Sequence, residues 1–109
     1  MATKFKTLNT GSISDGAYAE VTWSPSKDIT IKKMIMNERS GTAGNNTQVY
    51  ISIATVPYTL DFVPAAVIGN SPEYCWKPEL AVPKSAEIYI KIVNNEGAAK
   101  NWDIVFEYE

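Results

Sequence analysis

The stretch Lys100-Asn-Trp-Asp-Ile-Val-Phe-Glu-Tyr-Glu109 decides the fold, because apolar and polar side chains alternate along it with a period of two. This pattern is typical of a β-strand with one buried face. The side chains expected on that face are Trp102, Ile104, Phe106 and Tyr108.

Residues 87–93 show the same alternation just before this strand. Asn94-Asn95-Glu96-Gly97 between the two strands supplies residues that tolerate positive φ, as tight turns require. We therefore expect the strands to form a hairpin. Their inward side chains should make the centre of the core: Ile88, Ile90, Ile92, Trp102, Ile104 and Phe106.

Earlier segments predict further strands at residues 5–8, 17–23, 29–36 and 48–56. The first is followed by a Gly-Ser sequence that indicates a turn. In the third, Lys33 falls among apolar positions, which indicates a bulge or a strand end.

The proline-rich segment, residues 57–83, gives a weaker signal, because its prolines remove backbone donors that strand pairing needs. We expect two short strands there, at residues 58–63 and 73–77, and a helical turn at residues 65–68.

The chain therefore holds about eight strands, and 109 residues leave room for one core only. We predict a single domain, residues 1–109, of the all-β class. The expected architecture is an antiparallel β-sandwich of jelly-roll or Greek-key type.

The charges are balanced and scattered: ten Lys and Arg stand against twelve Asp and Glu, and no basic run is longer than Lys32-Lys33. A nucleic-acid partner is not expected, since it would need clustered cations. No apolar run approaches the ~20 residues of a membrane span, and no apolar segment follows the first lysines as in a signal peptide. We expect a protein that is made and kept in a cytoplasm or released by lysis, without a membrane partner.

Catalytic chemistry is not expected. The sequence has no histidine, which removes the commonest general base and the commonest zinc ligand. The lone Cys75 is expected to be a small buried residue in a strand. The carboxylates near strands are interpreted as solvated. We therefore predict no catalytic residue, no metal site and no cofactor.

Two sets of aromatic residues are candidates for binding. The set in the proline-rich segment could form an exposed platform for a sugar or a subunit interface, with core packing as the alternative: Tyr58, Phe62, Tyr74 and Trp76. A second set lies on the nominally polar faces of strands and indicates another partly covered surface: Tyr18, Tyr50 and Tyr89.

Four segments carry a family resemblance: ITIKKMIMN at 29–37 before a polar loop, VYISI at 49–53, LAVPK at 80–84 leading into EIYIKIVNN at 87–95, and VFEYE at 105–109. In this layout the chain resembles small jelly-roll virion proteins of tailed phages and related viruses, such as head-decoration and fibre-type subunits. Members usually place a glycine where this chain has Ser85.

The resemblance implies a non-enzymatic structural protein of the virion, assembled in the host cytoplasm. It implies a homo-oligomer, frequently a trimer, that binds other virion proteins on a capsid or tail surface. A carbohydrate-binding module is the alternative, because such modules share the sandwich and use exposed aromatic side chains. They are usually secreted or fused to an enzyme.

Overall fold

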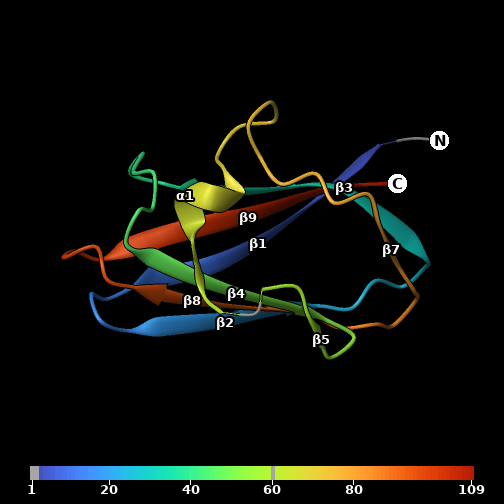
Figure 1. Cartoon of the computed structure of the whole chain (residues 1–109), viewed down its shortest axis with the longest axis horizontal. Coiled ribbons are helices and arrows are strands. Elements are labelled where there is room, and N and C mark those ends of the chain that lie inside the picture. Colours follow the sequence, from blue (N-terminus) through green and yellow to red (C-terminus); the bar gives the residue numbers. More distant parts are fainter. Residues whose placement is uncertain (1–2, 60) are drawn as a thin grey trace.

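Two antiparallel sheets packed face to face make up the molecule in the computed structural model, which describes residues 3–59 and 61–109 (Figure 1). Sheet A has the order β1 (Lys4–Ile13), β9 (Lys100–Tyr108), β3 (Ile29–Glu38) and β7 (Leu80–Val82). Sheet B has the order β2 (Tyr18–Trp23), β8 (Ile88–Asn94), β4 (Thr47–Ile53) and β5 (Val56–Pro57), and β6 (Val63–Pro64) also pairs with β4. The predicted all-β sandwich is confirmed.

The path of the chain between the sheets is that of a jelly roll. From β1 to β4, and again from β6 to β9, every connection passes from one sheet to the other. Among the described strands, only β4, β5 and β6 follow one another within a sheet, and β5 and β6 both pair with β4. The nine strands of residues 3–59 and 61–109 therefore occupy the eight places of a two-sheet jelly roll.

The expected hairpin between the last two long strands is wrong. β8 pairs with β2 and β4 in sheet B, and β9 pairs with β1 and β3 in sheet A. The buried Asn94 side chain donates to the carbonyl oxygens of Ile13 and Ala98 at 2.8 Å each, which anchors the loop that crosses between the sheets. The inward residues were nevertheless correct, because both strands bury the predicted faces against the same core.

Bulges shift the register of two strands. The pairing of β3 with β9 is irregular between Ile31 and Lys33. A bulge or a strand end was predicted here from the position of Lys33 among apolar residues. Beyond this bulge the inward positions are Met34 and Met36. The predicted turn after residue 8 is wrong, since β1 continues to Ile13 through an irregularity that contains Gly11 at φ 70°.

The proline-rich segment forms less strand than predicted. Residues 58–63, of which residue 60 lies outside the described residues, contribute only Val63 to a two-residue strand. Residues 73–77 contribute a single bridge between Trp76 and Met34. Prolines explain this, because each one removes a ladder donor. The predicted helical turn is confirmed as α1 (Ala65–Ile68), and Leu80–Val82 forms the edge strand β7.

The core lies between the sheets and contains side chains from both. Its largest fully buried side chains include Trp102, Phe106, Ile31, Met34, Met36, Ile51, Ile88, Ile90, Ile92 and Ile104. Both chain ends emerge at one end of the sandwich, and the loops after β3 and β8 lie at the other end (Figure 1).

Candidate functional site

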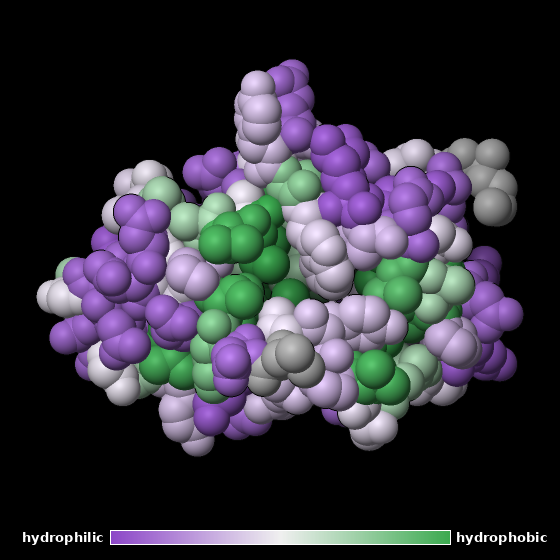
Figure 2. All heavy atoms as spheres, in the orientation of Figure 1, coloured by the Kyte–Doolittle hydropathy of each residue, from purple (hydrophilic) through white to green (hydrophobic). Residues whose placement is uncertain are grey.

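Tyr58 and Trp76, predicted to belong to one aromatic set, do face each other. Their ring centroids are 6.4 Å apart and tilted by 53°. They line a crevice of about 390 Å³, which we call the side crevice, together with the buried Ile51 and Ile68. On this face of the molecule apolar side chains gather over α1 and its surroundings (Figure 2).

Cys75 also lines the side crevice, and the prediction of a buried cysteine in a strand is wrong. It is half-buried in a bend, where its thiol lies 3.7 Å from the carbonyl oxygen of Pro72. Cys75 lies in a bend because the chain folds back closely on itself at this point. A Cβ on residue 69 would lie 1.9 Å from the Tyr74 carbonyl oxygen, so the close approach requires Gly69.

The other two predicted aromatic residues lie elsewhere. Tyr74 projects from the bend before Cys75 with 79% of its surface exposed and does not line the side crevice. Phe62 packs against Tyr50 of β4, with ring centroids 5.9 Å apart. The four residues of the predicted set therefore do not converge on one point.

Phe62 instead extends a row of rings across the outer face of sheet B. Tyr50 also packs against Tyr89 of the neighbouring strand β8, with centroids 6.2 Å apart in an edge-to-face arrangement. Tyr18 lies on β2, on the other side of β8. The predicted second surface thus gathers Tyr18, Tyr50 and Tyr89, and it takes Phe62 from the first set.

Lys91 occupies the centre of this face. It is the cross-strand partner of both Glu20 on β2 and Tyr50 on β4. Its ammonium nitrogen lies 4.4 Å from the centroid of the Tyr18 ring, within cation–π range. We call this surface the tyrosine face and define it as Tyr18, Glu20, Tyr50, Phe62, Tyr89 and Lys91.

A hydrogen bond fixes the Tyr89 side chain on this face. Its hydroxyl donates to the Glu20 carboxylate at 2.5 Å. This bond, aided by burial and by the negative charge of Glu20, raises the pKa of Tyr89 to about 12. The phenol therefore stays protonated at neutral pH, and it offers an ordered hydrogen-bonding group on an apolar ring rather than a base.

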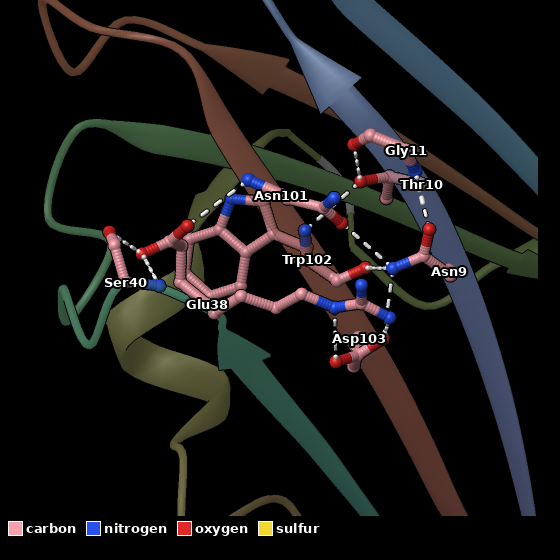
Figure 3. Close-up of polar contacts among 9 residues, drawn as sticks. Asn9, Thr10, Gly11, Glu38, Ser40, Asn101, Trp102 and Asp103 are labelled. Atoms are coloured by element: carbon pink, nitrogen blue, oxygen red, sulfur yellow. Dashed lines mark hydrogen bonds and ion pairs between the residues drawn. The ribbon is translucent and has the colours of Figure 1, made fainter.

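A cluster of polar side chains around Glu38 lies at the end of the sandwich opposite the termini, and Figure 3 shows its contacts. Glu38, only 4% exposed, accepts hydrogen bonds from the backbone and hydroxyl of Ser40, the backbone and hydroxyl of Thr42, and the backbone of Asn101. Burial disfavours its charge, but the hydrogen bonds outweigh burial and lower the pKa of Glu38 to about 2. The carboxylate ties the loop after β3 to β9.

This cluster continues onto the outer face of sheet A. Arg39 donates two hydrogen bonds to the Asp103 carboxylate, at 3.0 and 3.1 Å, and Asn9 donates to the same carboxylate at 2.9 Å (Figure 3). The hydrogen bond from Arg39 lowers the pKa of Asp103. These hydrogen bonds connect β1 and β9 with the loop that follows β3, so the cluster is a structural network.

Sequence reasoning missed Lys91 and Glu38, and it interpreted Glu20 as one of the solvated carboxylates. Glu38 follows Met34 and Met36 at a spacing of two, so an inward carboxylate could have been found from periodicity. Lys91 and Glu20 acquire their role only through strand pairing, which periodicity does not give.

The rings, the Tyr89 hydroxyl and the Lys91 ammonium group of the tyrosine face can contact a ligand or a partner protein. Among residues 3–59 and 61–109 no three metal-ligating side chains come together. No helix in that part of the chain is long and apolar enough to cross a bilayer. Comparison with known protein families, with curated proteins and with solved structures finds no match.

Proposed function

We propose that the protein is a non-enzymatic structural subunit of a virion that assembles with copies of itself, as a trimer, and binds other virion proteins on a capsid or tail surface. The single observation that carries the assembly part is the tyrosine face. The virion part rests on the resemblance to small jelly-roll virion proteins.

The tyrosine face has the composition of a contact surface. An antiparallel sheet that packs on one side usually turns polar residues to water on the other, yet four rings lie together on the outside of sheet B. Tyrosine and phenylalanine are enriched where proteins meet. Tyr18 and Phe62 remain exposed, so part of this aromatic area is open to a partner.

Contacts within the subunit also order the side chains of the tyrosine face in the absence of a partner. The Tyr89 hydroxyl is bonded to Glu20, and Lys91 is placed over Tyr18. Ordered side chains lose less conformational entropy on association than free ones, which favours binding. The contact surface extends to the side crevice with Tyr58 and Trp76, because the edge of sheet B is formed by β5 and β6, which flank Tyr58.

Light scattering on a matched pair of variants tests the assembly. We expect the unmodified protein to show an oligomer mass and Tyr50→Lys, in the middle of the tyrosine face, to shift it toward the monomer. Thr7→Lys adds the same charge on the outer face of sheet A and should keep the oligomer. A monomer mass for the unmodified protein at high concentration, or equal behaviour of both variants, would contradict the proposal.

Genes beside the coding sequence test the virion part independently. Neighbouring capsid, portal or tail genes would support it. Neighbours that encode glycan-degrading enzymes would contradict it.

A carbohydrate-binding module is the second candidate, favoured by one feature of the tyrosine face. Aromatic rings that alternate with an ordered hydroxyl, a carboxylate and an ammonium group can pack on the apolar faces of sugars and hydrogen-bond their hydroxyls. A glycan array with the unmodified protein and Tyr50→Lys separates the two candidates. Saturable sugar binding lost in Tyr50→Lys, with an unchanged monomer mass, would favour the module.

A further inference from the structure

A second, chemically different recess lies at one end of the sandwich. Figure 1 shows that both termini lie at this end. The recess is a cleft of about 810 Å³ between the ends of the two sheets, which we call the lysine cleft. Its aromatic lining is Trp23 and Tyr108, whose ring centroids are 5.2 Å apart, and its aliphatic lining includes Ile29 and Val82. The size falls within the range of about 300–1,000 Å³ usual for small-molecule sites.

Two lysines reach this cleft from an unexpected direction. In the pairing of β1 with β9, Lys4 is opposite Tyr108 and Lys6 is opposite Phe106. Directly opposed residues of an antiparallel pair share a face of the sheet, so both lysines project from the side of sheet A that carries the core. Lys27, in the connection after β2, is a third lysine on the lining.

The lysines of the cleft are not ion-paired within the described residues. There, Lys4, Lys6 and Lys27 have no ion-pair partner within 4.0 Å. Two acidic residues also line the cleft, so three lysines stand against two carboxylates there. Asp28 accepts a hydrogen bond from the backbone of Lys84 at 2.8 Å, and Glu109 lies 3.8 Å from Lys32.

We propose that the lysine cleft binds a small amphipathic anion, with a carboxylate, sulfonate or phosphate group at the lysines and an apolar body on Trp23 and Tyr108. The three lysines bind the anionic group, and the aromatic lining contacts the apolar body. A purely inorganic anion would leave the aromatic lining unused, and a neutral apolar molecule would leave the lysines unpaired.

A competing explanation for the inward lysines is protection of the sheet edge. β1 is at the edge of sheet A, and inward-pointing charges discourage pairing with a second molecule. The explanations differ in their response to charge reversal. Lys6→Glu keeps a charge of equal magnitude on the edge strand, but it repels an anion.

Titration with anilinonaphthalene sulfonate, followed by the three indole N–H signals in nuclear magnetic resonance, tests the proposal. We expect saturable binding that shifts the Trp23 signal and leaves that of the buried Trp102 unchanged. Lys6→Glu and Lys27→Glu should each weaken binding by about tenfold or more. Lys100→Glu, the same change at the far end of β9, should bind like the unmodified protein. Dispersed indole signals show that each variant is folded.

The outcomes that would overturn the proposal are distinct. Equal binding by Lys6→Glu and the unmodified protein would leave edge protection as the role of that lysine. A shift of the Trp76 signal without one at Trp23 would move the binding to the side crevice. Inorganic sulfate that shifts Trp23 as strongly as the dye at the same concentration would reduce the cleft to a simple anion site.

Discussion

Glu38 makes the stability of the protein depend on pH in a predictable direction. Its folded-state pKa of about 2 is below the ordinary value of 4.5, so the unfolded state binds more protons between these values. The stabilisation is fully present above about pH 4.5 and is lost as the pH falls toward 2. Urea denaturation over this range should show a loss of about 2–3 kcal/mol from Glu38. Asp103, with its lowered pKa, adds to the loss in the same direction.

A matched pair of variants isolates the contribution of Glu38. Glu38→Gln should be less stable at neutral pH, because the amide NH2 group would replace a carboxylate oxygen that accepts hydrogen bonds and would face their donors. The stability of this variant should vary less between pH 4.5 and 2. Glu87→Gln removes an exposed carboxylate whose side chain makes no hydrogen bond within the described residues, and it should keep the original pH dependence. Identical acid sensitivity of both variants would contradict this role of Glu38.

Gly44 is required for a steric reason that Gly97 does not share. Both have a positive φ, 86° and 87°, so a change to alanine strains the backbone at either one. A Cβ at Gly44 would also lie 2.5 Å from the buried Trp102 ring, whereas a Cβ at Gly97 meets nothing within 4 Å. We expect Gly97→Ala to cost ~1–2 kcal/mol and Gly44→Ala ~2–4 kcal/mol in denaturant unfolding. Equal costs would mean that Trp102 can move aside.

At the scale of the element, the hairpin between β4 and β5 uses a turn without its favoured residues. Ala54 and Thr55 both have positive φ, 52° and 66°, as in a two-residue turn of type I′. Asn-Gly is the favoured sequence for that turn. The double change Ala54→Asn and Thr55→Gly should therefore stabilise the protein by ~1–2 kcal/mol in thermal or denaturant unfolding. A loss of stability would show that these side chains hold the turn in another way.

The long strands were predictable because a period of two is a local property. Ile88, Ile90 and Ile92 had to share a face whatever lay beside them. Their sheet partners were not predictable, because strand pairing joins residues far apart in sequence, such as Val21 with Ile90. A short loop with turn residues after β8 is compatible with a hairpin and with a crossing between sheets. The buried Asn94 side chain supports the crossing, and its role depends on Ile13, more than 80 residues earlier.

The candidate site was predictable only in part, for the same reason. Tyr18, Tyr50 and Tyr89 could be assigned to outward strand faces from the alternation alone. That they lie on three neighbouring strands follows from the order β2-β8-β4, which the sequence pattern does not contain. The proline-rich aromatics have no regular strand to fix their direction, so Phe62 and Tyr74 could not be separated from Tyr58 and Trp76 in advance.

At the scale of the whole molecule, the lysine cleft lies apart from the tyrosine face and the side crevice. The tyrosine face is on the outside of sheet B, the side crevice is at the edge formed by β5 and β6, and the lysine cleft is at the end that holds both termini. An oligomer that forms through the tyrosine face therefore uses none of the residues that line the lysine cleft. Binding and assembly can be measured independently, since variants of one surface change no residue of the other.

Truncations in the core and on the surface should separate stability from assembly. Phe106 is buried between the sheets and packs against Trp23 at 5.7 Å, so Phe106→Ala should cost ~3–5 kcal/mol, the range for large aromatic deletions. That is a large share of the ~5–15 kcal/mol that stabilises a small domain, and the variant should be largely unfolded or insoluble. Tyr50→Ala removes an outward ring, so it should unfold at nearly the original denaturant concentration while its mass in solution falls. Denaturant melts and light scattering on the same samples measure both effects. Equal destabilisation at the two positions would mean that the rings of the tyrosine face stabilise the subunit itself, and the proposed assembly surface would then have no support.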